Sequence, residues 1–195
     1  MSRFSILPLT SPETQSVTRR SVPAPVRFSN IHQSQSYGSA QPNSMSVTKL
    51  RSTPPFYTQE KSSSCLPACL RMVLAAHGVK LSERELRRRT GWKEQFGTSS
   101  SAVVKTATAL GFVNSRETSG LRLYDLRDAL RTGIYPIVGI GLAPYGHNGQ
   151  HAQVVIRVTS RGVNVHDPLL GRLTPNLLTF ESAWQLTDFL TVLIS

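Results

Sequence analysis

The pattern of apolar and polar positions divides the chain into two parts. Residues 1–55 show no sustained apolar period of 2 or 3.6, whereas apolar residues recur regularly from Phe56 onward. Helical spacing and stop signals first predict four helices, over 65–76, 82–91, 99–110 and 123–131. Runs of apolar and β-branched residues then predict strands over 135–140, 153–158, 163–166 and 189–194, with a short helix over 179–185. Helices that precede an antiparallel sheet indicate the α+β class, with helices packed on one side of the sheet.

Local signals place Cys65 at the start of the first of these helices. Three serines, Ser62 to Ser64, precede it and offer helix caps, and Pro67 fits the first turn. Gly78 is a good stop signal at the other end. We therefore expect Cys65 to lie at the N-terminal end of a helix of about three turns.

The first 55 residues have the composition of a leader. They contain twelve serines, seven of the twelve prolines of the chain, and six basic residues against a single acidic one, Glu13. A segment with so few apolar residues cannot bury enough surface to fold by itself. We predict a disordered, basic, Ser/Pro-rich leader over 1–55 and one compact domain over 56–195. The composition of this leader fits an organellar transit peptide as well as the secretion signal of an injected bacterial effector.

The charge and hydropathy of the chain exclude some classes of partner. The net charge of +11 would suit nucleic acid or an anionic membrane, but the positive residues are scattered. The exception, Arg87–Arg89, falls on a predicted helix and is expected to be a solvated face. No motif combines aromatic and basic residues as nucleic-acid binders do. No apolar run approaches the roughly 20 residues of a membrane-spanning helix. We expect neither a nucleic-acid partner nor a membrane span.

The two cysteines are expected to have different roles. Four residues apart on one helix, Cys65 and Cys69 share a face but are too far apart for an unstrained disulfide, so we predict free thiols. The positive field at a helix N-terminus favours the thiolate that a nucleophile needs, which identifies Cys65. Cys69 is expected to be a small buried hydrophobe. A metal site built from both cysteines and a histidine is an alternative, although structural zinc usually takes four ligands in paired spacings.

His151 is the predicted base for this thiol, and Asp167 is its predicted partner. His151 begins a predicted strand after a Gly/Asn-rich loop, and Asp167 leaves the next strand at the same edge of the sheet. The hairpin register sets the two residues a few positions out of line, so a twist or a β-bulge has to bring them together. A carboxylate on one imidazole nitrogen would leave the other nitrogen facing the thiol.

Gln59 is the candidate that completes an acyl-transfer site. It lies six residues before Cys65, on the segment that leads into the helix. Its side-chain amide and the backbone N–H of Cys65 could converge on one developing oxyanion. Gln59, Cys65, His151 and Asp167 are therefore the predicted catalytic residues, and no cofactor or metal is required for them to act.

Two blocks of the chain resemble papain-like cysteine peptidases. Residues 59–72 read Q-E-K-S-S-S-C-L-P-A-C-L-R-M, and residues 150–171 read Q-H-A-Q-V-V-I-R-V-T-S-R-G-V-N-V-H-D-P-L-L-G. Both are similar to the bacteriocin-leader-processing (double-glycine) peptidases and to the avirulence cysteine-protease effectors of plant-pathogenic bacteria. In the effectors, too, the later block is followed by a short helix and a tryptophan, here Trp184. Leu66-Pro67 departs from the papain pattern, which often has an aromatic residue or a glycine near this position.

The resemblance implies a papain-like fold and a thiol endopeptidase acting on a protein or peptide. With the acid-poor leader, it suggests a virulence effector that a bacterium secretes into a host cell, where a host protein would be the substrate; a cytoplasmic enzyme is the alternative. Two other functions stay open on the same fold. One is a catalytically inactive binding module. The other is a transferase or deamidase, because an amine as well as water can resolve a thioester.

Overall fold

The structure is a computed structural model and describes residues 52–195. The predicted leader over 1–55 therefore lies almost entirely outside the described residues. The helices are α1 (Cys65–Ala76), α2 (Glu83–Arg89), α3 (Ser100–Ala109), α4 (Leu123–Arg131) and α5 (Leu177–Gln185). The strands are β1 (Arg116–Thr118), β2 (Ile137–Gly141), β3 (Gln150–Val158), β4 (Val163–Asp167), β5 (Gly171–Leu173) and β6 (Thr191–Leu193). A 3-10 turn, η1 (Ala143–Tyr145), follows β2.

Helix boundaries follow the capping signals of the sequence, with one exception. The hydroxyl of Ser82 accepts a hydrogen bond from the Glu85 N–H at 3.2 Å and begins α2. Ser99 begins α3 in the same way, through the Ala102 N–H. The exception is Ser64, which precedes α1 but makes no side-chain cap hydrogen bond to that helix. The predicted start of α1 at Cys65 is confirmed, while the hydroxyl of its N-cap serine is engaged elsewhere.

The strands form one six-stranded antiparallel sheet in the order β1-β6-β2-β3-β4-β5. The predicted strands correspond to β2, β3, β4 and β6. The two edge strands, β1 and β5, have only three residues each and were not predicted, because so short a segment carries no readable alternation. The α+β class is confirmed, with N-terminal helices preceding the sheet.

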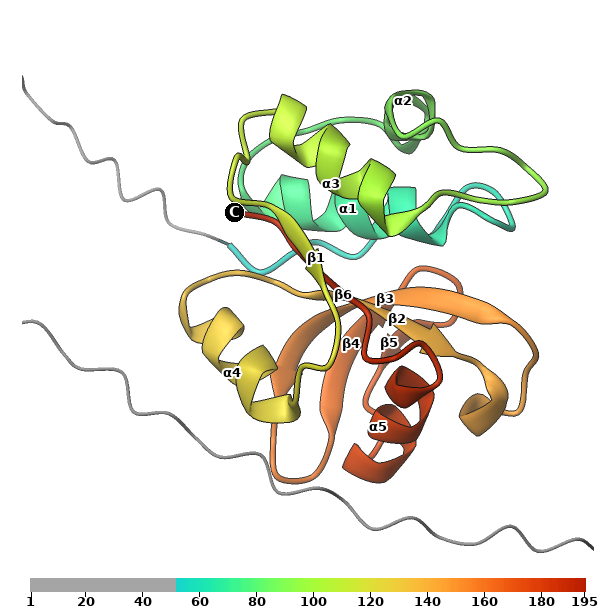
Figure 1. The fold of residues 1–195 in the computed structure, drawn as a ribbon, viewed down its shortest axis with the longest axis vertical. Coiled ribbons are helices and arrows are strands. Elements are labelled where there is room, and N and C mark those ends of the chain that lie inside the picture. The colour runs from blue at the N-terminus through green and yellow to red at the C-terminus, as the bar shows by residue number, and fades with distance from the viewer. Residues whose placement is uncertain (1–51) are drawn as a thin grey trace, which may run out of the picture. The chain divides into compact units, whose positions relative to one another are not determined.

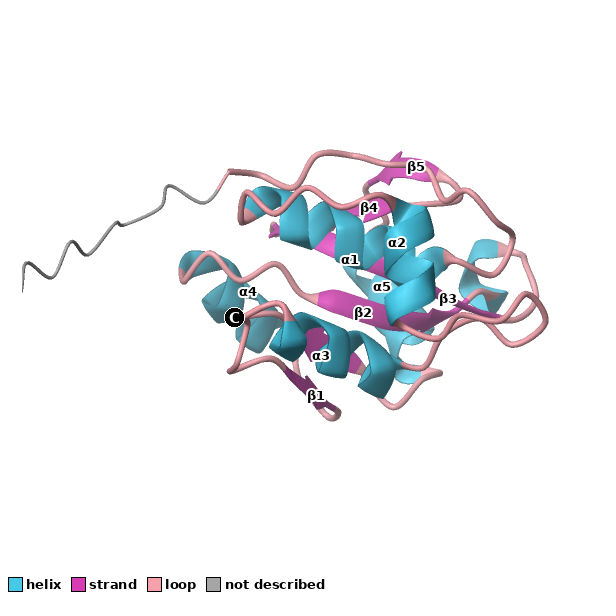
Figure 2. Cartoon of the chain, turned by 90° about the horizontal axis from the view of Figure 1, so that it is seen from above, coloured by secondary structure: helices cyan, strands magenta, loops and turns pink. Residues whose placement is uncertain are grey.

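The sheet is covered on both faces (Figure 1). Alternation along β2 sends Ile137 to one core, shared with α1, α2 and α3, and Val138 to a second core, shared with α4 and α5. Figure 2, seen from above, likewise shows α1, α2 and α3 lying over the strands. The expectation that helices cover one side of the sheet was therefore wrong. Burial of Phe180 and Trp184 against the far face gives α5 and the sheet a core of their own.

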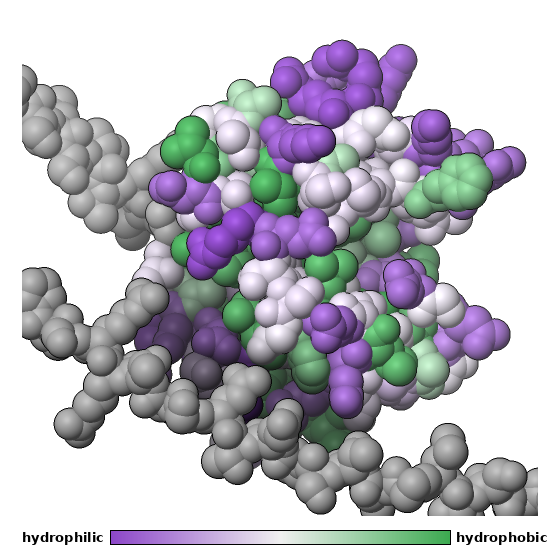
Figure 3. Space-filling view, in the orientation of Figure 1, coloured by the Kyte–Doolittle hydropathy of each residue, from purple (hydrophilic) through white to green (hydrophobic). Residues whose placement is uncertain are grey.

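Hydrophilic residues are spread over the face that Figure 3 shows, with apolar residues between them. Two of the four arginines of α2, Arg88 and Arg89, illustrate this, because they pair with Glu85 on the surface of their own helix. Arg87, which was expected to belong to the same solvated face, is instead mostly buried beside Glu60 and Glu83. None of the helices within residues 52–195 is long and apolar enough to cross a membrane.

Candidate active site

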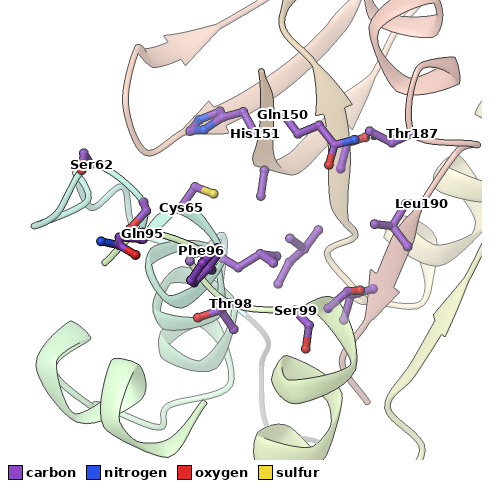
Figure 4. Close-up of a pocket in the computed structure, with 18 residues that line it drawn as sticks. Ser62, Cys65, Gln95, Phe96, Thr98, Ser99, Gln150, His151, Thr187 and Leu190 are labelled. Carbon is purple, nitrogen blue, oxygen red and sulfur yellow. Dashed lines mark hydrogen bonds between the residues drawn. The ribbon is translucent and has the colours of Figure 1, made fainter. Parts of the chain in front are cut away.

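Cys65 lies at the first turn of α1, at the edge of a cleft between the helical layer and the sheet (Figure 4). The cleft has a volume of about 430 Å³. His151 lines the same cleft from β3, and in Figure 4 the two side chains stand near each other at one end of it. The structure thus brings together a thiol and an imidazole that are 86 positions apart in the chain.

A β-bulge in the β3–β4 hairpin brings His151 and Asp167 together. Near the turn Val158 pairs with Val163, but the register shifts between Val155 and Arg157, so that Val154 pairs with His166. Continued by one residue, this register places Asp167 opposite Gln153, on the same face as His151. Without the shift Asp167 would lie opposite Val154, and its side chain would point away from His151. Of the two expected alternatives, a twist or a β-bulge, the structure shows a shift of register of the kind that a bulge produces.

Asp167 is completely buried and accepts hydrogen bonds at both carboxylate oxygens. Oδ1 accepts from the backbone N–H groups of Leu169 and Leu170, each at 2.8 Å, and lies 2.8 Å from His151 Nε2. Oδ2 accepts from Gln153 Nε2 at 2.7 Å. Burial alone would raise the pKa of Asp167, but its hydrogen bonds to His151, Gln153 and Leu170 outweigh burial and lower it. Asp167 is therefore held as a carboxylate beside the imidazole.

His151 is bonded to Asp167 through one ring nitrogen and lies near Cys65 at the cleft (Figure 4). Nε2 bonds to Asp167, which leaves Nδ1 as the ring nitrogen that can serve the Cys65 thiol. Burial would lower the pKa of His151, but the hydrogen bonds and charges of Asp167 and Cys65 outweigh burial and raise this pKa to about 9. An imidazole with this pKa is protonated at neutral pH, which stabilises a neighbouring thiolate.

Gln153 belongs to this site, although the sequence analysis did not identify it. It is fully buried and donates to Asp167 from β3, two residues after His151. The signal that could have found it is strand alternation, because residues i and i+2 of a strand share a face. A buried glutamine on the face that carries the histidine has to find a polar partner there.

Cys69 is not part of the reactive site. Its side chain is fully buried, and its thiol donates to the Ala152 carbonyl oxygen at 3.4 Å. Burial raises the pKa of Cys69 well above its ordinary value, with neighbouring negative groups adding to the effect. Both cysteines are free thiols, as predicted. No group of three or more His, Cys, Asp or Glu side chains within residues 52–195 is arranged to hold a metal ion.

Gln59 lies beside the site on the segment that leads into α1. Its backbone N–H donates to the Pro168 carbonyl oxygen at 2.9 Å, which ties this segment to the residue after Asp167. Its side-chain Nε2 donates to the carbonyl oxygens of Lys61 at 2.8 Å and Ser62 at 2.9 Å. Both amide hydrogens are therefore engaged. To stabilise an oxyanion, Gln59 would have to exchange one of these carbonyls for the substrate oxygen, so its role stays a prediction.

The cleft beside Cys65 has an apolar floor and a neutral rim. Its floor consists of Leu66 from α1, Ile137 from β2, Ala152 from β3, and Leu190 and Val192 at the β6 end. Its rim carries serine, threonine and glutamine side chains and the exposed ring of Phe96. Among the described residues that line the cleft there is no lysine, arginine, aspartate or glutamate.

Comparison with known families and proteins gives a consistent result. The model of the Peptidase C39 family matches residues 53–192. An uncharacterized protein of Methanothermobacter marburgensis is 34% identical over 115 residues, which cover 59% of this chain and 72% of the relative. An uncharacterized protein of Methanothermobacter thermautotrophicus is 32% identical over 116 residues, which cover 60% of this chain and 72% of the relative.

Solved structures share the fold at low sequence identity. A proposed C39-like peptidase from Bacillus anthracis has a TM-score of 0.62 at 13% identity, covering 72% of this chain and 94% of its own. The peptidase domain of Streptococcus ComA, a bifunctional ABC transporter of a quorum-sensing pathway, has a TM-score of 0.58 at 23% identity. The match covers 73% of this chain and 98% of that domain. A double-glycine-motif protease from an AMS/PCAT transporter, solved with a leader peptide, has a TM-score of 0.50 at 18% identity. The match covers 76% of this chain and 97% of that protease.

Proposed function

Given that the chain belongs to the Peptidase C39 family and is a cysteine peptidase, we propose that it cleaves peptide bonds through Cys65, His151 and Asp167. The observation that carries the proposal is the position of His151, which bonds to the Asp167 carboxylate at 2.8 Å and lines the same cleft as Cys65, with the two side chains near each other in Figure 4. This is the arrangement that activates a thiol nucleophile: the base faces the thiol, and a third group orients the base.

The proposed reaction has two halves. The Cys65 thiolate attacks the carbonyl carbon of the scissile bond, and protonated His151 gives its proton to the departing amine, which leaves a thioester. Water then attacks the thioester, His151 takes the proton of that water, and the carboxylic acid and the free thiol are regenerated. Asp167 holds the imidazole in one orientation throughout. The backbone N–H of Cys65 is the first candidate donor to the oxyanion, and Gln59 is the second.

The lining of the cleft favours a neutral substrate segment. A charged side chain entering this cleft would lose its hydration, which is costly. It would find no lysine, arginine, aspartate or glutamate among the described lining residues, and His151 is already paired with Asp167. An apolar side chain would instead be buried against Leu66, Ile137 and Val192. We therefore propose a peptide or protein substrate whose residue next to the scissile bond is uncharged and apolar.

The composition of residues 1–55 supports a second, separate proposal about location. A basic, acid-poor, Ser/Pro-rich segment is typical of the leaders of injected effectors, so we propose secretion into a host cell, where a host protein would be cleaved. Fusing residues 1–55 to a reporter enzyme in a bacterium with an injection apparatus tests this. Transfer of the reporter supports secretion, and retention of the reporter favours a cytoplasmic enzyme.

Limiting iodoacetamide, read by peptide mass at pH 7, tests the catalytic proposal without a known substrate. We expect Cys65 to be alkylated and Cys69 to be protected. His151→Ala should slow the Cys65 reaction more than tenfold, because the thiol loses the imidazole that accepts its proton and stabilises the thiolate. His147→Ala is the matched control, since His147 is an exposed residue of the neighbouring loop. In a quenched-peptide library, Cys65→Ala should lower cleavage more than about 10³-fold.

Two results would overturn the catalytic proposal. One is equal alkylation of the two cysteines with no dependence on His151. The other is cleavage that survives in Cys65→Ala. The mass of the product separates hydrolysis from transfer, because hydrolysis adds one water to the cleaved peptide whereas a transferase would join the acyl group to an amine.

A further inference from the structure

Glu83 is a fully buried carboxylate to which the catalytic proposal assigns no role. It lies in the first turn of α2, and its side chain is turned inward to the segment that precedes Cys65. The backbone N–H of Glu60 donates to both of its oxygens at 3.0 Å, and the Ser64 hydroxyl donates to Oε1 at 2.6 Å. One buried side chain of α2 therefore holds the residue after Gln59 and the residue before Cys65.

The Ser64 hydroxyl is engaged by Glu83 and by the segment before α1. A serine at the N-cap can turn its hydroxyl oxygen to the N–H of the second or third helical residue. Here the hydroxyl lies 2.6 Å from Glu83 Oε1 and 2.9 Å from the Lys61 carbonyl oxygen, accepts from the Lys61 N–H, and makes no cap hydrogen bond to α1. Cys65 is the first residue of α1, and the first N–H groups of a helix have no partner within the helix. The Cys65 N–H is thus available for a substrate oxygen.

Neighbouring groups hold Glu83 in place. The Arg87 guanidinium lies 3.1 Å from Glu60 and 3.8 Å from Glu83, so it bridges the two carboxylates. Arg87 also stacks over the ring of Trp92, whose indole N–H donates to the Ser63 carbonyl oxygen at 3.1 Å. Burial of a carboxylate is costly unless it is paired and hydrogen-bonded, and both conditions are met here.

We infer that Glu83 is a positioning residue of the active site: it fixes the 59–65 segment from both ends and so sets the position of the Cys65 N–H that would meet the oxyanion. The inference rests on the proposed role of Cys65 as the nucleophile. Its chemical content is the hydrogen bonding of the Glu60 N–H and the Ser64 hydroxyl to the one buried carboxylate of Glu83.

Steady-state kinetics of the Glu83→Gln variant test this inference. The substrate is the peptide of a quenched library that the wild type cleaves best. Glutamine keeps one acceptor oxygen but loses the second, so the 59–65 segment loosens. We expect kcat to fall about tenfold, with KM changed less than twofold, because loss of a whole oxyanion donor costs about 10²–10³. Ser64→Ala should lower kcat similarly, and the double variant should be no worse than either single one. Rates are normalised to the Cys65 that iodoacetamide can titrate, so misfolded molecules do not count.

Glu85→Gln is the matched control. Glu85 lies on the same helix and pairs with Arg88 and Arg89 on the surface, away from the 59–65 segment, so its kcat should equal that of the wild type. Wild-type kcat in Glu83→Gln, or additive losses in the double variant, would overturn the inference while Cys65 still reacts and cleaves. If Glu83→Gln does not fold, Ser64→Ala decides alone, and an unchanged kcat in that variant also overturns the inference. Failure of the catalytic proposal looks different, because Cys65 of the wild type would then be unreactive.

Discussion

At the scale of single residues, burial and hydrogen bonding shift the pKa values of His151 and Asp167 in opposite directions, and hydrogen bonding outweighs burial. Burial disfavours charge on both His151 and Asp167, yet their mutual bond raises the pKa of the histidine to about 9 and lowers that of the aspartate. Each shift favours the charged form in the folded protein. The His151–Asp167 pair therefore stabilises the fold in addition to its proposed role in catalysis, and its contribution to stability has to depend on pH.

The directions of the two pKa shifts determine whether the stability that each residue contributes rises or falls with pH. Stabilisation by His151 is complete below its unfolded pKa of about 6.5 and is lost as the pH rises through about 9. Stabilisation by Asp167 is present above its unfolded value and is lost as the pH falls through its lowered folded value. In urea unfolding, the excess stability of wild type over His151→Ala should shrink between pH 6.5 and pH 10. His147→Ala should show no such trend, and an excess that grows with pH would refute this prediction.

At the scale of elements, one bulge and one glycine shape the catalytic face. The bulge between Val155 and Arg157 sets the register that gives His151 and Asp167 a common side of the sheet. Gly139 lies on β2, two residues after Ile137, and so presents the same face to the cleft. A Cβ atom on Gly139 would come within 3.1 Å of Leu190 Cδ2 and 3.5 Å of Thr187 Oγ1. The missing side chain keeps this part of the cleft open.

Gly139→Val should therefore impair cleavage without impairing the nucleophile. The added side chain occupies the space between β2 and Leu190, so we expect kcat/KM for apolar peptides to fall at least tenfold. The rate of Cys65 alkylation by iodoacetamide should change less than twofold, because so small a reagent needs little of the cleft. Measuring both rates on one preparation checks the prediction. A parallel fall in both would mean that the substitution disturbs Cys65 itself.

At the scale of the whole molecule, the lysine, arginine, aspartate and glutamate side chains of the described residues lie away from the lining of the cleft. The chain carries a net charge of +11, yet no lysine, arginine, aspartate or glutamate of the described residues lines the cleft. Glu85 with Arg88 and Arg89 exemplifies the exposed charges, which pair on the surface and contribute little to stability. The basic charge can attract acidic partners over a distance, but such attraction is screened by salt. We propose that the cleft instead selects its substrate by the cost of desolvating a charged side chain.

Peptides that differ only next to the scissile bond test this separation. Leucine, valine or methionine at that position should be cleaved at least tenfold faster than aspartate, glutamate, lysine or arginine, because the cleft offers a charged group no partner. The ratio should persist in 0.5 M NaCl, since the loss of hydration is local and not a long-range attraction. Faster cleavage of acidic peptides, abolished by salt, would show that the surface charge selects the substrate instead.

The sequence by itself determined the chemistry and most of the elements. Helix spacing and serine signals were enough to place Cys65 at the start of α1, and β-branched runs were enough for β2, β3 and β4. Both kinds of signal are local, because caps and periodicity are properties of neighbouring residues. Cys69 could be separated from Cys65 for the same reason, as its position one turn inside the helix already indicated burial.

Only the tertiary structure decided how these parts meet. The shift in register that joins His151 to Asp167, the second core beneath α5, and the three-residue edge strands all depend on contacts between distant segments. The buried contacts of Gln153 and Glu83 belong to the same class, since nothing in the neighbouring sequence shows which hydrogen-bond partner a buried polar side chain will meet. Periodicity tells which face a residue occupies, but packing decides what lies opposite it.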